Sequence, residues 1–579
     1  MRNIKTTLTK GMLYQVLATM FVVLGQFSCS TQQQADLVIF NGRIYTVDSS
    51  QPVVEAVAVA DGRIVHTGRW TDTKKWVGDS TQVLDLNGKT MTPGFIEGHA
   101  HLMGIGKNLL DLDLAATRSY DEILNMVASK ANTLKPGEWV LGRGWHQDKW
   151  EEHPESMIGG FPSHQRLSGV SPNNPVFLSH ASGHAALVNA KAMELAGLNA
   201  DSKPPKGGEI LKDLSGKPTG LLNETAQSLV AAIIPKDSPE RNKKALKMAL
   251  DECLKNGITT FHDAGVDSTG IDLFKSLASK NELGVRLYVM LNGGNKNLIK
   301  AYAQHGPEIA LGNNFLTIRA IKLYADGALG SRGALLLDDY HDDPGMTGLR
   351  VQPLDYIKEI SLLGHSSGFQ VCTHCIGDKA NREILDLYEE IYSTDSLKGT
   401  ELRYRIEHAQ HISAQDIPRF GQLGVIPSMQ AIHMSSDRPW AINRLGKKRI
   451  DEGAYVWNKL TDTGATVMNG TDAPVEPINP IACFYAAVSR QTLAGTPTGG
   501  YEPSQKMTRI EALKSYTINN AYGAFEEKIK GTIEVGKLAD FTIFSHDIME
   551  VPVQELLKTR VEYTIIDGKI AFQRPAGDK

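Results

Sequence analysis

Cysteine is scarce in this sequence, with only five residues among 579. So few cysteines cannot form a disulfide framework, and an apolar core must therefore supply the stability of the fold. A large excess of one charge is also missing, because the formal net charge is −4. We see no basic stripe that would attract a nucleic acid. The composition therefore predicts a folded globular protein with no nucleic-acid partner.

The dinucleotide-binding fingerprint is absent as well. No GxGxxG motif follows a first predicted strand, which argues against a doubly wound, nucleotide-binding sheet. A chain of 579 residues is too long for one ordinary core. We therefore expect one large domain together with a smaller one.

The N-terminus has the pattern of a targeting segment. Basic residues precede the apolar run MLYQVLATMFVVLG, which is shorter than the roughly 20 residues that span a membrane. This order predicts a signal peptide over residues 1–29. Cys29 resembles the lipidated cysteine of a bacterial lipoprotein, although Gln26 departs from the aliphatic residue usual three positions earlier. With or without lipid anchorage through Cys29, we expect an exported protein, in the periplasm or anchored to a membrane of the cell envelope.

Both ends of the remaining chain are rich in predicted strands. Apolar runs are joined by Asn41-Gly42, Asp61-Gly62 and Asp567-Gly568, and such pairs favour tight hairpins because glycine readily adopts a positive φ. Neither end has enough strands to bury a face alone. We therefore predict one small β-sandwich domain composed of residues 36–93 and 527–579.

Residues 94–526 show strand-like runs that alternate with amphipathic helices. Ser238 is a predicted N-cap, and Pro239 suits the first turn of the helix that follows. Repeated β-α units predict an α/β fold, namely a closed (β/α)₈ TIM-like barrel, with an open doubly wound sheet as the alternative. The less regular segment from about 142 to 235 is expected to be an insertion over the barrel mouth. The predicted strands are GITTFHD (257–263), RLYVML (286–291), IRAIKLY (318–324), FQVCTH (369–374), YRIEH (404–408) and ATVMNGTD (465–472).

Polar residues interrupt or end these apolar runs, where a barrel carries its chemistry. In GFIEGHAHL, His99 and His101 are two residues apart, so on a strand both imidazoles lie on one face. Lys322 falls inside an apolar run, where an unpaired ammonium group is costly. The other residues of this kind are His374, His408 and Asp472.

These residue types are typical of a site for a cation such as zinc, which binds imidazole and carboxylate groups. For the HxH pair taken alone, a structural role is the alternative. The segment CTHC (372–375) resembles a redox motif, but no thioredoxin-like context surrounds it. We interpret its two cysteines as strand residues that flank His374.

The order HxH, Lys, His, His, Asp resembles the amidohydrolase superfamily of metal-dependent hydrolases. Six segments together resemble amidohydrolase family 3, the group that includes N-substituted formamide deformylases. The resemblance extends from about residue 36 to 572. Those segments are TPGFIEGHAHL, IKLYADGALGSRGA, THCIGD, RIEHAQ, NGTDAP and GTIEVGKLADFTIF.

This resemblance implies one or two zinc ions and a role for each residue. One ion would be bound by the HxH pair with Asp472, and a second by the two later histidines. Lys322 would be carbamylated to N6-carboxylysine and would bridge the ions, or would remain an amine beside a single ion. Asp472 would act as general base and then as general acid. The implied metal ligands are His99, His101, Lys322, His374, His408 and Asp472.

Further residues are expected near this centre. Ser331 and Arg332 would contact the substrate, unless Arg332 anchors a loop to Asp338 or Asp339. Glu97 would support the HxH pair, because metal-bound imidazoles usually donate to a carboxylate or carbonyl group.

In the insertion, Trp145 and His184 would line the pocket mouth, although packing is the favoured interpretation for Trp145. A further group of histidines is expected to be structural or on the surface. Its members are His146, His180, His262 and His411.

The predicted function is hydrolysis of a carbon–nitrogen bond in a linear or cyclic amide, a small-molecule substrate. Deamination, ester hydrolysis or isomerisation on the same scaffold is the first alternative, because a fold does not determine its chemistry. A non-catalytic binding lipoprotein is the second, although it would have no need for Asp472 opposite two metal ions. The sequence leaves the oligomeric state open, with a homodimer as one option.

Overall fold

The computed structural model describes residues 34–147, 150–180, 185–205, 208–394, 399–575 and 577. The predicted signal peptide and Cys29 lie outside these residues, as does His184. Among the helices described, none has the length and apolar character needed to cross a membrane.

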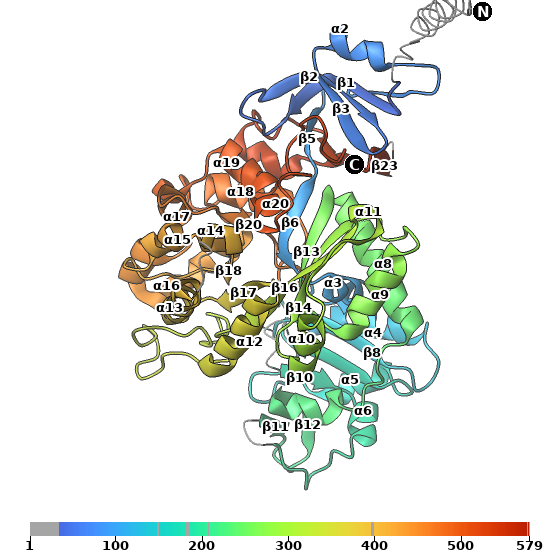
Figure 1. Cartoon of the computed structure of the whole chain (residues 1–579). Helices are drawn as coiled ribbons and strands as arrows, with labels where there is room; N and C mark the ends of the chain where they lie inside the picture. The colour runs from blue at the N-terminus through green and yellow to red at the C-terminus, as the bar shows by residue number, and fades with distance from the viewer. Residues whose placement is uncertain are drawn as a thin grey trace, which may run out of the picture.

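The largest sheet is a nearly closed parallel barrel, which confirms the predicted fold class (Figure 1). Neighbouring strands pair in parallel around the barrel. These strands are buried on both faces, so they appear in the sequence as apolar runs. In order around the barrel they are β6 (Phe95–Ala100), β13 (Ile258–Val266), β14 (Arg286–Asn292), β16 (Leu316–Tyr324), β17 (Gln370–Cys375), β18 (Arg405–His408), β19 (Ile426–Met429) and β20 (Met468–Asn469).

Helices follow or precede these strands and cover the barrel. In α8, the Ser238 side chain accepts a hydrogen bond from the N–H of Arg241, and Pro239 is in the first turn, as predicted. The main covering helices are α3 (Leu102–Leu110), α8 (Pro239–Lys255), α9 (Ser268–Ala278), α10 (Lys296–Ala303), α12 (Leu354–Ser366), α13 (Asp378–Ser393), α16 (Ala431–Gly453) and α18 (Pro480–Ser489).

A smaller sheet combines strands from both ends of the chain. Its two halves meet where β5 pairs antiparallel with β21, with Thr92 opposite Thr542. Only Gly94 separates β5 from barrel strand β6, so the small sheet continues directly into the barrel. Its strands are β1 (Leu37–Tyr45), β2 (Val53–Ala60), β3 (Arg63–Gly68), β4 (Gln82–Asp85), β5 (Thr90–Pro93), β21 (Phe541–Phe544), β22 (Val561–Ile566) and β23 (Lys569–Gln573).

Two of the three predicted hairpins are present. Asp61-Gly62 joins β2 to β3, and Asp567-Gly568 joins β22 to β23, with positive φ at all four residues. The hairpin predicted at Asn41-Gly42 is wrong, because β1 continues through it as one strand with a register shift between Phe40 and Ile44. Asn41 still has a φ of 58°, so the pair forms a bulge in place of a turn.

A third sheet, of six strands, lies between β6 and α8 in the chain. It extends from Leu112 to Glu224, and therefore begins ahead of the segment predicted as an insertion. In Figure 1 it lies at the end of the barrel opposite the small sheet. Its strands are β7 (Leu112–Asp113), β8 (Val140–Trp145), β9 (Val176–His180), β10 (Ala185–Val188), β11 (Gly208–Lys212) and β12 (Pro218–Glu224).

Candidate metal centre

The HxH pair lies at the C-terminal end of β6, and hydrogen bonds fix both imidazoles. His99 Nδ1 donates to Glu407 Oε2 over 2.5 Å, and His101 Nδ1 donates to the carbonyl oxygen of Ala264 over 2.9 Å. Since each Nδ1 is a donor, each Nε2 carries a lone pair. The Nε2 atoms of both rings lie near the same carboxylate, that of Asp472.

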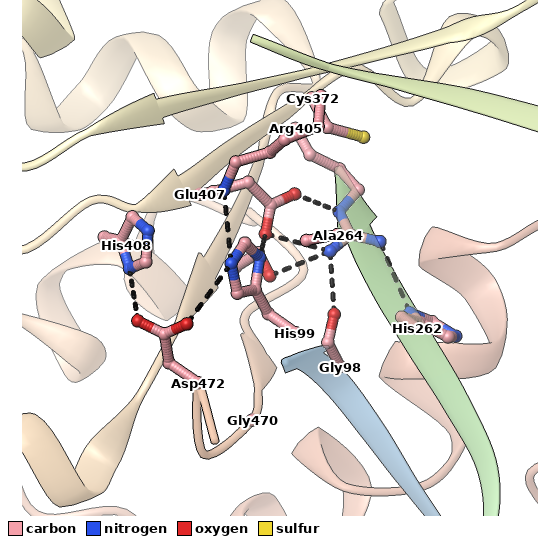
Figure 2. A network of polar contacts seen from close by, with 12 residues as sticks. Gly98, His99, His262, Ala264, Cys372, Arg405, Glu407, His408, Gly470 and Asp472 are labelled. Atoms are coloured by element: carbon pink, nitrogen blue, oxygen red, sulfur yellow. Dashed lines mark hydrogen bonds and ion pairs between the residues drawn. The ribbon is translucent and has the colours of Figure 1, made fainter. Parts of the chain in front are cut away.

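Asp472 lies beside His99 and His408 (Figure 2), and His101 is a third imidazole near it. Its Oδ1 is 3.2 Å from His101 Nε2 and 3.7 Å from His99 Nε2, and its Oδ2 is 4.0 Å from His408 Nδ1. One ligand atom from each of His99, His408 and Asp472 lies within 4.8 Å of the others. Residues from the first and sixth strands and from the loop after the eighth strand therefore meet at one point.

The backbone adopts an unusual conformation at two of these positions. His408 has a φ of 76° and Asp472 a φ of 58°, in the left-handed region that non-glycine residues rarely occupy. Such conformations cost about 1–3 kcal/mol each and persist only where the surroundings impose them. Here His408 Nδ1 donates to Gln430 Oε1 over 2.8 Å, and the N–H of Asp472 donates to the carbonyl oxygen of His99. The fold thus holds two strained residues in place at the centre.

Lys322 and His374 complete the group predicted from the sequence. Lys322 is buried on β16, with Nζ 3.1 Å from His99 Nε2. The His374 ring lies 4.3 Å from the His408 ring, between centroids. The structure therefore brings together all six predicted ligand residues.

Burial controls the protonation of these groups. It lowers the pKa of His99 to about 4 and that of His374 to about 3, with the Lys322 ammonium as the second cause. Burial also lowers the pKa of Lys322. Burial opposes ionisation of Asp472 too, but His101 and the neighbouring histidines lower the pKa of this carboxyl group well below its usual range. Burial opposes the protonation of His101 as well, but the hydrogen bond and the charge of Asp472 outweigh it and raise the pKa of His101. The centre thus presents neutral rings at His99, His374 and His408, with His101 paired to an ionised carboxylate.

These residues fit a divalent metal ion. His374 Nε2 and Asp472 Oδ1 are buried atoms without a hydrogen-bond partner among the described residues, and such orphaned atoms need an explanation such as an ion. Neutral imidazoles and a carboxylate are the form that metal binding requires. Glu407 also accepts from Arg405 over 3.0 Å, so the imidazole of His99 is oriented as in metal sites.

Glu97 supports the pair through the main chain and not through the imidazoles. Its Oε1 accepts from the N–H groups of His99 and Thr471, and its Oε2 accepts from Thr471 Oγ1. It therefore ties β6 to the loop that carries Asp472. The carboxylate that accepts from an imidazole is Glu407, which sequence reasoning missed although it directly precedes His408.

The remaining candidates make other contacts. Trp145 is fully buried in the third sheet and donates Nε1–H to the carbonyl oxygen of Leu178, which is a packing role. Ser331 is exposed and contacts the carbonyl oxygen of Ala328.

Arg332 anchors a loop, but the predicted partners, Asp338 and Asp339, are wrong. It pairs with Asp342 and Asp343, because the chain turns back toward it beyond Tyr340. His184 lies outside the described residues. Of the histidines expected to be structural or on the surface, His180, His262 and His411 are buried and His146 is partly buried.

Sequence reasoning missed another buried side chain, that of His433. It lies in the first turn of α16, directly after β19, with Nε2 3.9 Å from Asp472 Oδ2. His433 lies on a helix, whereas the candidate residues were those at the ends of predicted strands. Its position just beyond the seventh strand is the signal that could have found it.

Imidazoles, a buried lysine and a carboxylate lie together at the C-terminal strand ends of a parallel barrel. This arrangement is typical of the class of barrel proteins that carry a metal centre. The model of the amidohydrolase family matches residues 82–572. The chain therefore belongs to the amidohydrolase family.

Three similar proteins illustrate the relationship. Protein LONG AFTER FAR-RED 3 of Arabidopsis thaliana is 33% identical over 523 residues, which cover 88% of this chain and 87% of that protein. N-substituted formamide deformylase of Arthrobacter pascens is 29% identical over 559 residues, covering 94% and 99%. The crystal structure of an uncharacterized metal-dependent hydrolase from Pyrococcus horikoshii OT3 matches with a TM-score of 0.75 at 27% identity, covering 89% of this chain and 99% of that one.

Proposed function

We propose that this protein is a metal-dependent hydrolase that cleaves a carbon–nitrogen bond of the amide type. The observation that carries the proposal is the position of the Asp472 carboxylate, 3.2–4.0 Å from three imidazoles at the barrel's strand ends. The similarity to an N-substituted formamide deformylase over nearly the full length of both chains supports the amide class.

The six residues that converge there would bind the proposed ion or ions. His99, His101 and Asp472 would hold one zinc ion, and His374 and His408 would hold a second, with carbamylated Lys322 between them. When bound, zinc supplies a water molecule acidic enough to attack near neutral pH, and it polarises the carbonyl group. Asp472 would accept the proton of that water and deliver it to the departing nitrogen.

Space for a small substrate lies beside the centre. A cavity of about 250 Å³ opens next to His101, between α3 and α9. Polar side chains line it, among them Asp263 and Asn292. His101 lines this cavity and lies 3.2 Å from Asp472, so a substrate there would lie beside the proposed ligands.

A substrate panel tests the proposal. The zinc-loaded protein is assayed with N-substituted formamides, linear and cyclic amides, N-acyl amino acids, an ester and an amino-heterocycle. We expect turnover of one amide class that is lost on chelation and restored by zinc, with one or two ions per chain by metal analysis. Turnover that survives complete chelation would contradict the proposal, and a preference for the ester or the heterocycle would favour the alternative chemistries.

We also propose that the protein is exported and anchored through Cys29. The basic start and the short apolar run before that cysteine support this proposal. Metabolic labelling with a fatty-acid probe tests it, and Cys29→Ser should remove the label without preventing export. An unprocessed, unlabelled chain in the cytoplasm would contradict it.

A further inference from the structure

The side chain of His433 is buried, yet one of its ring nitrogens has no hydrogen-bond partner. Nε2 is without a partner among the described residues, and only 6% of the residue is exposed. That atom lies 3.9 Å from Asp472 Oδ2, and the ring stacks on that of His408 with 6.2 Å between centroids. His433 therefore faces the centre without belonging to the predicted ligand set.

The other nitrogen of His433 determines where the ring proton lies. Gln410 Nε2 contacts His433 Nδ1 over 2.7 Å. An amide NH₂ group can only donate, so Nδ1 accepts and the neutral ring carries its proton on Nε2. His99, His101 and His408 have the opposite arrangement, because the Nδ1 of each donates to an oxygen atom. The centre thus combines imidazoles that present lone pairs with one that presents an N–H group.

A buried N–H group without an acceptor costs about 1–3 kcal/mol. An acceptor that arrives with the substrate would remove that cost. From this geometry, and resting on the hydrolase function proposed above, we propose that His433 is a further catalytic residue. Its Nε2–H donates to the carbonyl oxygen of the substrate and stabilises the negative charge that develops there.

The proposed step balances without any proton transfer at His433. As the oxygen of water bonds to the carbonyl carbon, the π electron pair moves onto the carbonyl oxygen, which the N–H group stabilises. When the carbon–nitrogen bond breaks, the carbonyl re-forms and the nitrogen leaves with the proton that Asp472 delivers. The hydrogen bond is strongest when the charge is largest, so it should act on kcat more than on KM.

Two substitutions separate this role from a packing role. In His433→Asn the shorter side chain places its amide near the position of Nδ1, so the donor at Nε2 is lost. In His433→Gln the longer side chain brings an amide donor to the position of Nε2. We expect His433→Asn to lower kcat by about 10²–10³-fold, as for removal of an oxyanion donor, with nearly unchanged KM and full metal content. His433→Gln should recover part of that loss. The buried His411 offers the matched control, and His411→Asn should keep the wild-type kcat.

A wild-type kcat in His433→Asn would overturn the proposal. Loss of bound metal in step with loss of rate would also overturn it, because His433 would then be a ligand.

Nitrogen-15 NMR of the metal-free protein, labelled at histidine, provides a readout that does not depend on turnover. The signal that disappears in His433→Asn should be that of a neutral ring protonated at Nε2. A ring protonated at Nδ1 would overturn the donor role and leave the hydrolase proposal intact. A wild-type protein that hydrolyses no amide would overturn the hydrolase proposal and, with it, the role of His433 in that reaction.

Discussion

The main-chain N–H of Asp472 donates a hydrogen bond to the carbonyl oxygen of His99 over 2.8 Å. A second main-chain bond, from His101 to Ala473, lies beside it. These bonds join the loop after the last barrel strand to the end of the first. The barrel therefore closes at the point where the candidate metal ligands meet.

Glu97 should stabilise this junction between the first barrel strand and the loop that carries Asp472. Glu97→Ala would leave three buried donors without their acceptor, on His99 and Thr471, and should cost at least about 2 kcal/mol of unfolding free energy. Glu97→Gln keeps an oxygen of the same shape and should recover most of that loss. Denaturant unfolding of the metal-free protein measures both, and equal stability of the two variants would contradict the prediction.

Asp472→Asn should abolish turnover and preserve the fold. Asparagine has nearly the same shape, but it can neither accept the proton nor deliver it, and loss of such a group costs about 10²–10⁴-fold in rate. Steady-state kinetics test the loss of turnover, and thermal unfolding of the same sample tests whether the fold is preserved. A wild-type rate in this variant would count against the proposed proton transfer.

Lys322→Ala should lower the amount of bound zinc and the rate together. If Lys322 is carbamylated, its ammonium group has lost two protons as the nitrogen bonded to carbon dioxide, and an anionic carbamate replaces the costly buried positive charge. Acetate or propionate should then restore part of the activity by supplying a carboxylate in the space left by the side chain. A carbon-13 NMR signal from labelled carbon dioxide should appear in the wild type only. Its absence, with full activity, would favour a free amine.

The buried ion pair of Arg286 and Asp540 should be a major contact between the barrel and the small sheet. Two hydrogen bonds, of 2.7 and 3.0 Å, join the side chains, and both residues are almost fully buried. Asp540→Ala would leave the buried guanidinium with only a longer, 3.5 Å contact to the carboxylate of Asp567 and should cost about 3 kcal/mol. The exposed pair of Arg69 and Asp72 is the control, and Asp72→Ala should cost under about 1 kcal/mol. Equal costs would contradict the prediction.

The pair of Arg403 and Glu527 should make stability depend on pH. Burial opposes ionisation of Glu527, but the hydrogen bonds from Arg403 lower its pKa below the ordinary value of 4.5. An acid with a lowered pKa in the folded state stabilises the fold above its ordinary pKa and loses that effect as the pH falls. Glu527→Gln should therefore cost about 1 kcal/mol at pH 7, and this difference should shrink as the pH falls below the ordinary pKa of 4.5 and vanish below the lowered pKa of the folded state.

Unfolding of wild type and variant across pH 3–8 measures that difference. Glu555→Gln removes one side of an exposed pair and should show little difference at any pH. A constant difference for Glu527→Gln would contradict the assignment.

The barrel and the convergence of polar residues at its strand ends could be predicted because buried strands leave long apolar runs in which polar residues stand out. Other features carry weaker signals. Asn41-Gly42 suits a bulge as well as a turn, and only the pairing of β1 with β2 distinguishes them. His433 lies on a helix, where the spacing of residues does not reveal that it faces Asp472.

The pairing of β5 with β21 also determines when the small sheet can be completed during synthesis. A ribosome makes β21 some 450 residues after β5, so one edge of β5 waits for its partner until the barrel between them has been made. Until then the main-chain groups on that edge stay unpaired, and a chain that stopped before β21 would keep them so. Completion of this sheet therefore reports that the barrel between its two halves has been made.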